Sequence, residues 1–150
     1  MKPKLNVRLL NKVKRSIMEH PQNVDMQHWV NHEDEDAECG TAGCIAGWVV
    51  ANGDLEKLRK LHMPPMFADN EKARRAGLKI KDRAIKLLGL SRRKEWANCL
   101  FKIESWPQEL YDQYVSLETR KAQAKVVVKV IDRFIELFRK EGKNVRPTIF

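Results

Sequence analysis

The sequence predicts an all-α fold, a single compact domain of about six to seven helices. Apolar residues recur every three or four positions along most of the chain, as in Leu9, Val13 and Ile17, and this is the repeat of one helix face. The first of these series predicts a helix from Lys4 to Glu19, which ends at His20-Pro21. The chain has 150 residues, 43% of them hydrophobic, which is enough for one domain to bury a core without disulfides or metals.

A buried apolar helix is expected at the centre of the fold, over residues 42–51. Every residue of this segment is apolar or glycine, so the helix has no polar face to turn toward water. Thr41 suits its N-cap, and Asn52-Gly53 suits its C-terminal end. Because Gly43 and Gly47 lie four residues apart on one helix face, we expect another helix to approach closely there.

Three shorter helices are expected in the middle of the chain. Asp54 suits the N-cap of the first, whose apolar positions are Leu55, Leu58 and Leu61. A basic stretch over 69–76 is expected to be helical and to break at Gly77. The third helix is expected over 82–88.

Three further helices are expected in the C-terminal part. One follows Ser91, and a second begins at Pro107, a residue that suits the first turn of a helix. The longest is expected over 118–141, ends at Gly142, and should pack along the helix at 42–51. Residues 1–142 are therefore expected to form the helical domain, and 143–150 a basic C-terminal tail.

The charge predicts an acidic partner. The chain carries 29 Lys and Arg against 20 Asp and Glu, a formal net charge of +9. Between residues 72 and 94 there are ten basic residues and one acid. From this stretch we expect a basic binding face that includes Lys72, Arg74, Arg75, Lys79, Arg83, Arg92, Arg93 and Lys94. Few aromatic residues accompany these cations, which favours contacts to phosphates over stacking on single-stranded bases.

One segment of the sequence is strongly acidic, in contrast to the basic stretch at 72–94. Residues 33–38 hold five acids in six positions. Two interpretations are open: an exposed loop, or a segment that folds back on the protein's own basic face and competes with a polyanion.

A loop-to-helix junction at Gly40 and Thr41 offers a second candidate site. Free backbone N–H groups at the start of a helix at Ala42 would attract an anion, and Gly40 would let a ligand come close. The junction lacks the Gly-Lys-Ser/Thr of a phosphate-binding loop, and no strand precedes it as in a dinucleotide fold. The alternative is that the junction is architectural.

The segment Cys39-Gly40-Thr41-Ala42-Gly43-Cys44-Ile45-Ala46-Gly47-Trp48 resembles a pattern in small uncharacterised proteins of bacteria and their phages. Met26-Gln27-His28-Trp29, Leu87-Leu88-Gly89-Leu90-Ser91, Leu100-Phe101 and Trp106-Pro107 are similar to further elements of those proteins. The resemblance covers about residues 17–115 and implies a helical domain in a phage or bacterial setting. It implies no activity, and it does not include the basic stretch or the long C-terminal helix.

The cysteines allow two chemical hypotheses beside ordinary packing. His28, His32, Cys39 and Cys44 lie within 17 residues, and zinc binds His and Cys, although the spacing is not that of common structural sites. Cys39 with His32 as a base would suit a thiol enzyme, but no residue is evident to orient the His, and nearby acids would raise the pKa of the thiol. We therefore expect no enzyme, no cofactor and no metal.

The resulting hypothesis is a non-enzymatic binding protein that docks nucleic acid or an acidic protein on the basic face. Two alternatives stay open: a nucleotide or phosphometabolite binder at Gly40 and Thr41, and a structural or inhibitory partner in a larger protein assembly. The longest uncharged run has 15 residues, which is short of the roughly 20 that span a bilayer, and no apolar signal core follows Met1. We therefore expect a cytoplasmic protein that does not insert into membranes.

Overall fold

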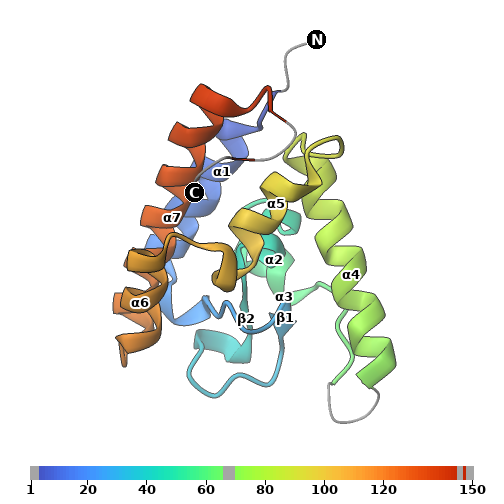
Figure 1. The fold of residues 1–150 in the computed structure, drawn as a ribbon. Coiled ribbons are helices and arrows are strands. Elements are labelled where there is room, and N and C mark those ends of the chain that lie inside the picture. The colour runs from blue at the N-terminus through green and yellow to red at the C-terminus, as the bar shows by residue number, and fades with distance from the viewer. Residues whose placement is uncertain (1–3, 66–69, 145–146, 148–150) are drawn as a thin grey trace.

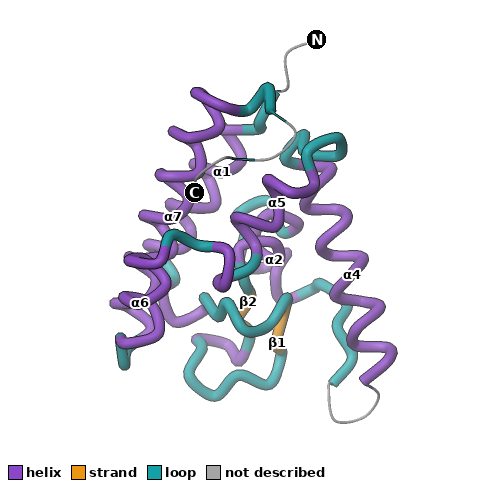
Figure 2. Tube along the Cα trace, in the orientation of Figure 1, coloured by secondary structure: helices purple, strands orange, loops and turns teal. Residues whose placement is uncertain are grey.

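The computed structural model describes residues 4–65, 70–144 and 147, and in these it is all-α with one very small sheet (Figures 1 and 2). The seven α-helices among the described residues are α1 (Val7–Glu19), α2 (Ile45–Val50), α3 (Leu55–Arg59), α4 (Asn70–Leu87), α5 (Lys94–Phe101), α6 (Gln108–Ser116) and α7 (Arg120–Glu141). Strands β1 (Val30–Asn31) and β2 (Ala42–Gly43) pair antiparallel. The expected fold class is confirmed.

The helices lie in two groups with α2 between them. Figure 1 shows α1, α6 and α7 on one side of the molecule and α4 on the other. Helix α2 packs against α1, α3, α4 and α5, and its residues Ile45 to Val49 are all buried. The expectation of a central apolar helix is therefore confirmed. No helix of the described residues is long and apolar enough to cross a membrane.

The central helix is shorter than the sequence suggested. Ala42 and Gly43 form β2, where they pair with Asn31 and Val30 of β1, and α2 begins only at Ile45. The predicted start at 42 was wrong because these two residues use their backbone groups in strand pairing. A helix of six residues also offers little surface to a long neighbour, and α7 packs mainly against α1 and α6 instead of along α2, as we had expected.

The sequence predicted that the basic helix would break at Gly77, but the structure shows no break there. Helix α4 is continuous across it, and a Cβ atom at Gly77 would lie 2.3 Å from Cδ1 of Trp29. The glycine therefore makes room for the indole ring. Gly47 of α2 faces the same residue, since its Cβ would lie 2.3 Å from the carbonyl oxygen of Trp29. The close neighbour that we expected at Gly47 is thus a short extended segment rather than a helix.

The acidic segment is anchored to α7. Asp34 is buried, and its carboxylate accepts a hydrogen bond from Nη2 of Arg120 at 2.6 Å. Nη1 of the same guanidinium donates to the carbonyl oxygen of Gln22 at 2.9 Å. The other acids, Glu33, Glu35, Asp36 and Glu38, are exposed. The segment is therefore an exposed loop with one buried anchor, and that anchor lies on α7 rather than on residues 72–94.

Candidate anion-binding groove between α3 and α4

Four basic residues form a row along one face of α4. Lys72, Arg75, Lys79 and Arg83 are separated by three, four and four residues, the spacing at which helical side chains lie above one another. Ala73, Ala76, Ile80 and Ala84 are buried on the adjacent face and fix how the helix sits on the domain. The row, called the cationic row below, is therefore held at the surface by a buried apolar stripe.

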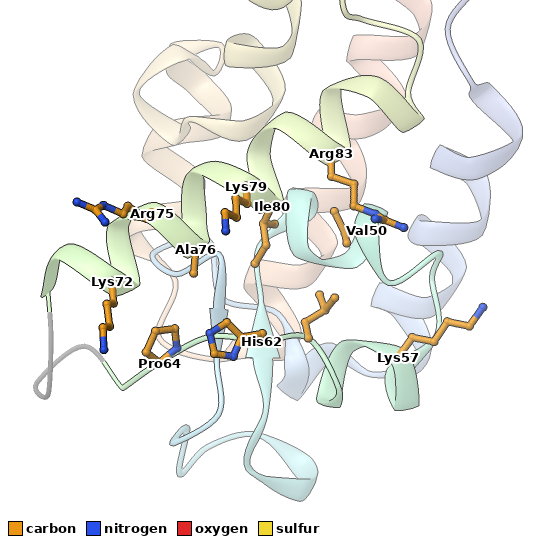
Figure 3. A pocket seen from close by; sticks show the side chains of 11 residues that line it. Val50, Lys57, His62, Pro64, Lys72, Arg75, Ala76, Lys79, Ile80 and Arg83 are labelled. Atoms are coloured by element: carbon orange, nitrogen blue, oxygen red, sulfur yellow. The ribbon is translucent and has the colours of Figure 1, made fainter.

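The cationic row lines a groove of about 900 Å³. The opposite wall comes from α3 and the segment after it, with Lys57, Leu61, His62 and Pro64. Val50, Ala76 and Ile80 also line the groove, and none of its lining residues in the described part of the chain is an acid. Figure 3 shows Lys72 and Lys79 reaching from α4 toward the segment with His62 and Pro64, whereas Arg75 extends away from it.

Two of the cations in the groove, Lys79 and Arg83, are not neutralised by the described residues. Lys79 and Arg83 are exposed, and within the described residues neither makes an ion pair or a side-chain hydrogen bond. Like charges four residues apart on a helix destabilise it, by about 0.2–0.5 kcal/mol per pair. The row therefore weakens α4 slightly in the free protein, and a bound anion would relieve this repulsion.

The first turn of α4 contains an acid that partly compensates its neighbours. Nη2 of Arg74 lies 3.0 Å and Nε of Arg75 3.2 Å from Oε1 of Glu71. The hydrogen bond from Arg74, more than any other contact, lowers the pKa of Glu71. Arg74 projects from a different face of α4 than the groove, so Glu71 leaves Lys79 and Arg83 unaffected.

The remaining cations of the predicted basic face lie elsewhere. Nε of Arg93 donates to the carbonyl oxygen of Gly142 at 3.2 Å, and its Nη2 donates to that of Lys143 at 3.3 Å. Arg93 is thus a structural cap on the C-terminal end of α7. Arg92 and Lys94 are exposed at the start of α5 and do not line the groove. The structure therefore brings together four of the eight predicted cations and separates the others.

Lys81 lies on another face of α4, near Lys94 at the start of α5 and Lys102 just after α5. Burial lowers the pKa of Lys81, and the nearby charges of Lys102 and Lys94 lower it further. These residues are not in the lining of the groove. The basic stretch at 72–94 is therefore not one surface, because a continuous helix turns its cations to more than one side.

The predicted anion site at Gly40 and Thr41 loses its structural basis. Helix α2 begins four residues after Thr41, so no helix N-terminus lies at this junction. Thr41 is buried; its hydroxyl lies 3.1 Å from Nδ1 of His32, and its carbonyl accepts a hydrogen bond from Nδ2 of Asn23 at 2.8 Å. Thr41 is not an N-cap, and its polar groups are used inside the protein.

The cysteine and histidine hypotheses gain no support from the geometry. Nε2 of His32 lies 2.6 Å from the carbonyl oxygen of Leu61, so both ring nitrogens of His32 have internal partners. The three cysteines are free, and burial raises the pKa of Cys44 to about 11, so its thiol is protonated at neutral pH. Among the described residues, no three His, Cys, Asp or Glu side chains are grouped so that they could hold a metal ion.

Sequence reasoning missed the second wall of the groove. Lys57, Leu61 and His62 lie at least ten residues before the cationic row, in a segment that the sequence identified only as a short helix and a turn. The ring of His32 holds this segment through the carbonyl of Leu61. The sequence predicted only that the cations between residues 72 and 94 form a basic face.

No known protein family, curated protein or solved structure matches this chain. The resemblance to small proteins of bacteria and phages therefore stays a prediction, and the candidate site depends on its own geometry.

Proposed function

We propose that this protein is a non-enzymatic binding protein that docks an anionic macromolecule on the cationic row of α4. One observation carries the proposal: Lys72, Arg75, Lys79 and Arg83 line one groove from a single face of α4, and within the described part of the chain no acidic residue lines it. An anion in this groove meets several cations at once and displaces the counterions that otherwise surround them.

The energetics of the free protein support this role. Cations on one helix face repel each other, and Lys79 and Arg83 gain no compensating ion pair within the described residues. Some exposed cations elsewhere pair with acids, as Arg133 does with Glu109 at 2.9 Å, whereas others, such as Lys125, make no ion pair within the described residues. Two cations that repel each other on one helix face and have no ion pair within the described residues, as Lys79 and Arg83 do, suit a surface that meets a negatively charged partner.

The salt dependence of binding tests the proposal. The probe is a fluorescein-labelled mixed-sequence DNA duplex of about 20 base pairs, used as a model polyanion in anisotropy titrations. If four cations contact phosphates, the logarithm of the association constant falls with the logarithm of salt concentration with a slope of about −3 to −4. Lys79→Ala and Arg83→Ala should each reduce the magnitude of this slope by about one.

The matched control is Lys125→Ala on α7. Lys125 is exposed like Lys79 and lies in a helix, but far along the chain from the groove. We expect its slope to equal that of the unmodified protein. A slope near zero, or an equal loss in Lys125→Ala and Lys79→Ala, would contradict the proposal, because binding would then be weak or would depend only on net charge.

A further inference from the structure

The floor of the groove is apolar, which a purely electrostatic surface does not need. Its apolar lining consists of Val50 at the end of α2, Leu61 at the base of the opposite wall, and Ala76 and Ile80 of α4. Val50 and Leu61 are half-buried, so they pack against the core while part of each side chain faces the groove. A ligand that fills the groove therefore covers hydrocarbon at its centre and meets cations at its edges.

The dimensions of the groove suit one face of a helix. The cationic row extends over the 11 residue steps from Lys72 to Arg83, which is about 16 Å at ~1.5 Å per residue. An α-helix lying along α4 would present about three turns over this length. Lys57 stands on the other side of the floor, so a cation would lie at each edge of the bound helix.

Nucleic acid fits this lining less well than a protein segment does. Phosphates gain from donors and cations but pay a desolvation cost against hydrocarbon. Single-stranded bases gain from stacking on aromatic rings, and among the described residues no Phe, Tyr or Trp lines the groove. A protein segment with an apolar stripe bordered by carboxylates complements both the apolar floor and the cationic row of the groove.

A second copy of this chain fits less well too. The acidic segment at 33–38 contains Ala37 as its one apolar residue, and Asp34 is fixed inside the protein by Arg120. This loop would satisfy the cations but leave Val50 and Leu61 without an apolar partner.

We infer that the groove between α3 and α4 binds an acidic amphipathic helix of another protein, with the apolar stripe of that helix on Val50, Leu61, Ala76 and Ile80 and its carboxylates against the cationic row. This inference rests on the proposed function and adds the class of partner. Recognition of an amphipathic helix through its apolar anchors is a recurring mode of binding, and the charged edges would fix the position of the helix in the groove.

The test compares two fluorescein-labelled peptides of about 18 residues with equal composition. In one, leucines recur every three and four residues with glutamates on both sides; in its isomer, the same leucines are distributed around the helix. We expect the amphipathic peptide to bind at least tenfold more tightly than the isomer. Equal affinities would overturn the inference, because equal charge alone would then explain binding.

Variants of the floor separate this inference from the proposed function. Val50→Thr keeps the shape of the side chain, Leu61→Asn removes apolar surface at a half-buried position, and each should lower the affinity for the amphipathic peptide about tenfold. Their affinity for the DNA duplex should not change. Val115→Thr, at an exposed valine of α6, is the matched control and should bind the peptide normally.

The outcomes are distinguishable. If the floor variants bind the peptide as tightly as Val115→Thr does, the inference fails while a salt-dependent row on α4 still supports the proposed function. If Lys79→Ala and Arg83→Ala change neither peptide nor DNA binding, the proposed function fails as well. Thermal unfolding monitored by circular dichroism identifies any variant that loses its fold, and Val50→Thr is the variant expected to keep it.

Discussion

The double reversal Lys79→Glu/Arg83→Glu is expected to weaken binding of an anionic macromolecule at least 100-fold. Each substitution removes a charge-assisted contact and adds a like-charge repulsion, and a factor of ten in affinity corresponds to about 1.4 kcal/mol. Both side chains are exposed, and neither has a partner to lose within the described residues. The helix content and thermal stability should therefore stay close to those of the unmodified protein.

The control for this reversal is Lys125→Glu/Lys129→Glu on α7. These lysines are exposed, are four residues apart on a helix like Lys79 and Arg83, and give the same change in net charge. Anisotropy titrations with the duplex and the amphipathic peptide should show less than a threefold loss. If both double variants lose binding equally, the partner recognises overall charge and not the cationic row.

Arg93 is unsuitable for such a reversal, although the sequence placed it in the binding face. Its guanidinium donates to the carbonyl oxygens of Gly142 and Lys143 at the end of α7. A glutamate there would repel these carbonyls and destabilise the C-terminal helix. A loss of binding in the Arg93→Glu variant would therefore reflect damage to the fold and would not show that Arg93 contacts the partner.

Gly47→Ala is expected to lower the free energy of unfolding by at least about 3 kcal/mol, although alanine favours an exposed helix by about 1 kcal/mol over glycine. The new Cβ would lie 2.3 Å from the carbonyl oxygen of Trp29, which belongs to the backbone and cannot rotate away. Either α2 or the segment leading into β1 must shift, and both contact the core. Chemical denaturation monitored by circular dichroism measures the loss.

Trp29→Ala provides the control, because Gly47 contacts the backbone of Trp29 whereas Gly77 contacts its indole ring. At Gly77 the neighbouring atoms are Cδ1 and Nε1 of the indole, so Trp29→Ala should relieve the stress of Gly77→Ala. The same substitution leaves the carbonyl in place and should not rescue Gly47→Ala. Equal rescue of both glycine variants would show that the backbone at Trp29 is not the obstacle.

The helical periodicity of the sequence predicted the fold class because long amphipathic segments such as α1 and α7 carry their own signal. The periodicity predicted the wrong local structure at positions where contacts with distant parts of the chain determine it. Gly77 has the local preference of a helix breaker, yet it lies inside α4 because Trp29 packs against it. Ala42 and Gly43 continue an apolar run, yet they pair with β1, a contact that no local pattern shows.

The candidate site was predictable only in part, for a similar reason. The sequence placed Lys72, Arg75, Lys79 and Arg83 in one basic stretch, but the helix break that it predicted at Gly77 separated the first two from the last two. The continuous helix α4 places all four on one face. Arg93 lies apart from the groove because its guanidinium binds the carbonyl oxygen of Gly142 at the end of α7, nearly fifty residues further along the chain. The wall with Lys57 and His62 depends on the position of the segment just after α3, which His32 holds through the carbonyl oxygen of Leu61.

The central claim is that the cationic row of α4 is the surface that meets a negatively charged partner. Amide chemical-shift mapping by NMR, with ¹⁵N-labelled protein titrated with the unlabelled DNA duplex and then with the unlabelled amphipathic peptide, tests it most directly. The account predicts that the largest shifts fall within residues 72–83 and 57–64. Shifts that cluster at residues 121–129 of α7, or that spread evenly over the exposed lysines and arginines, would contradict it.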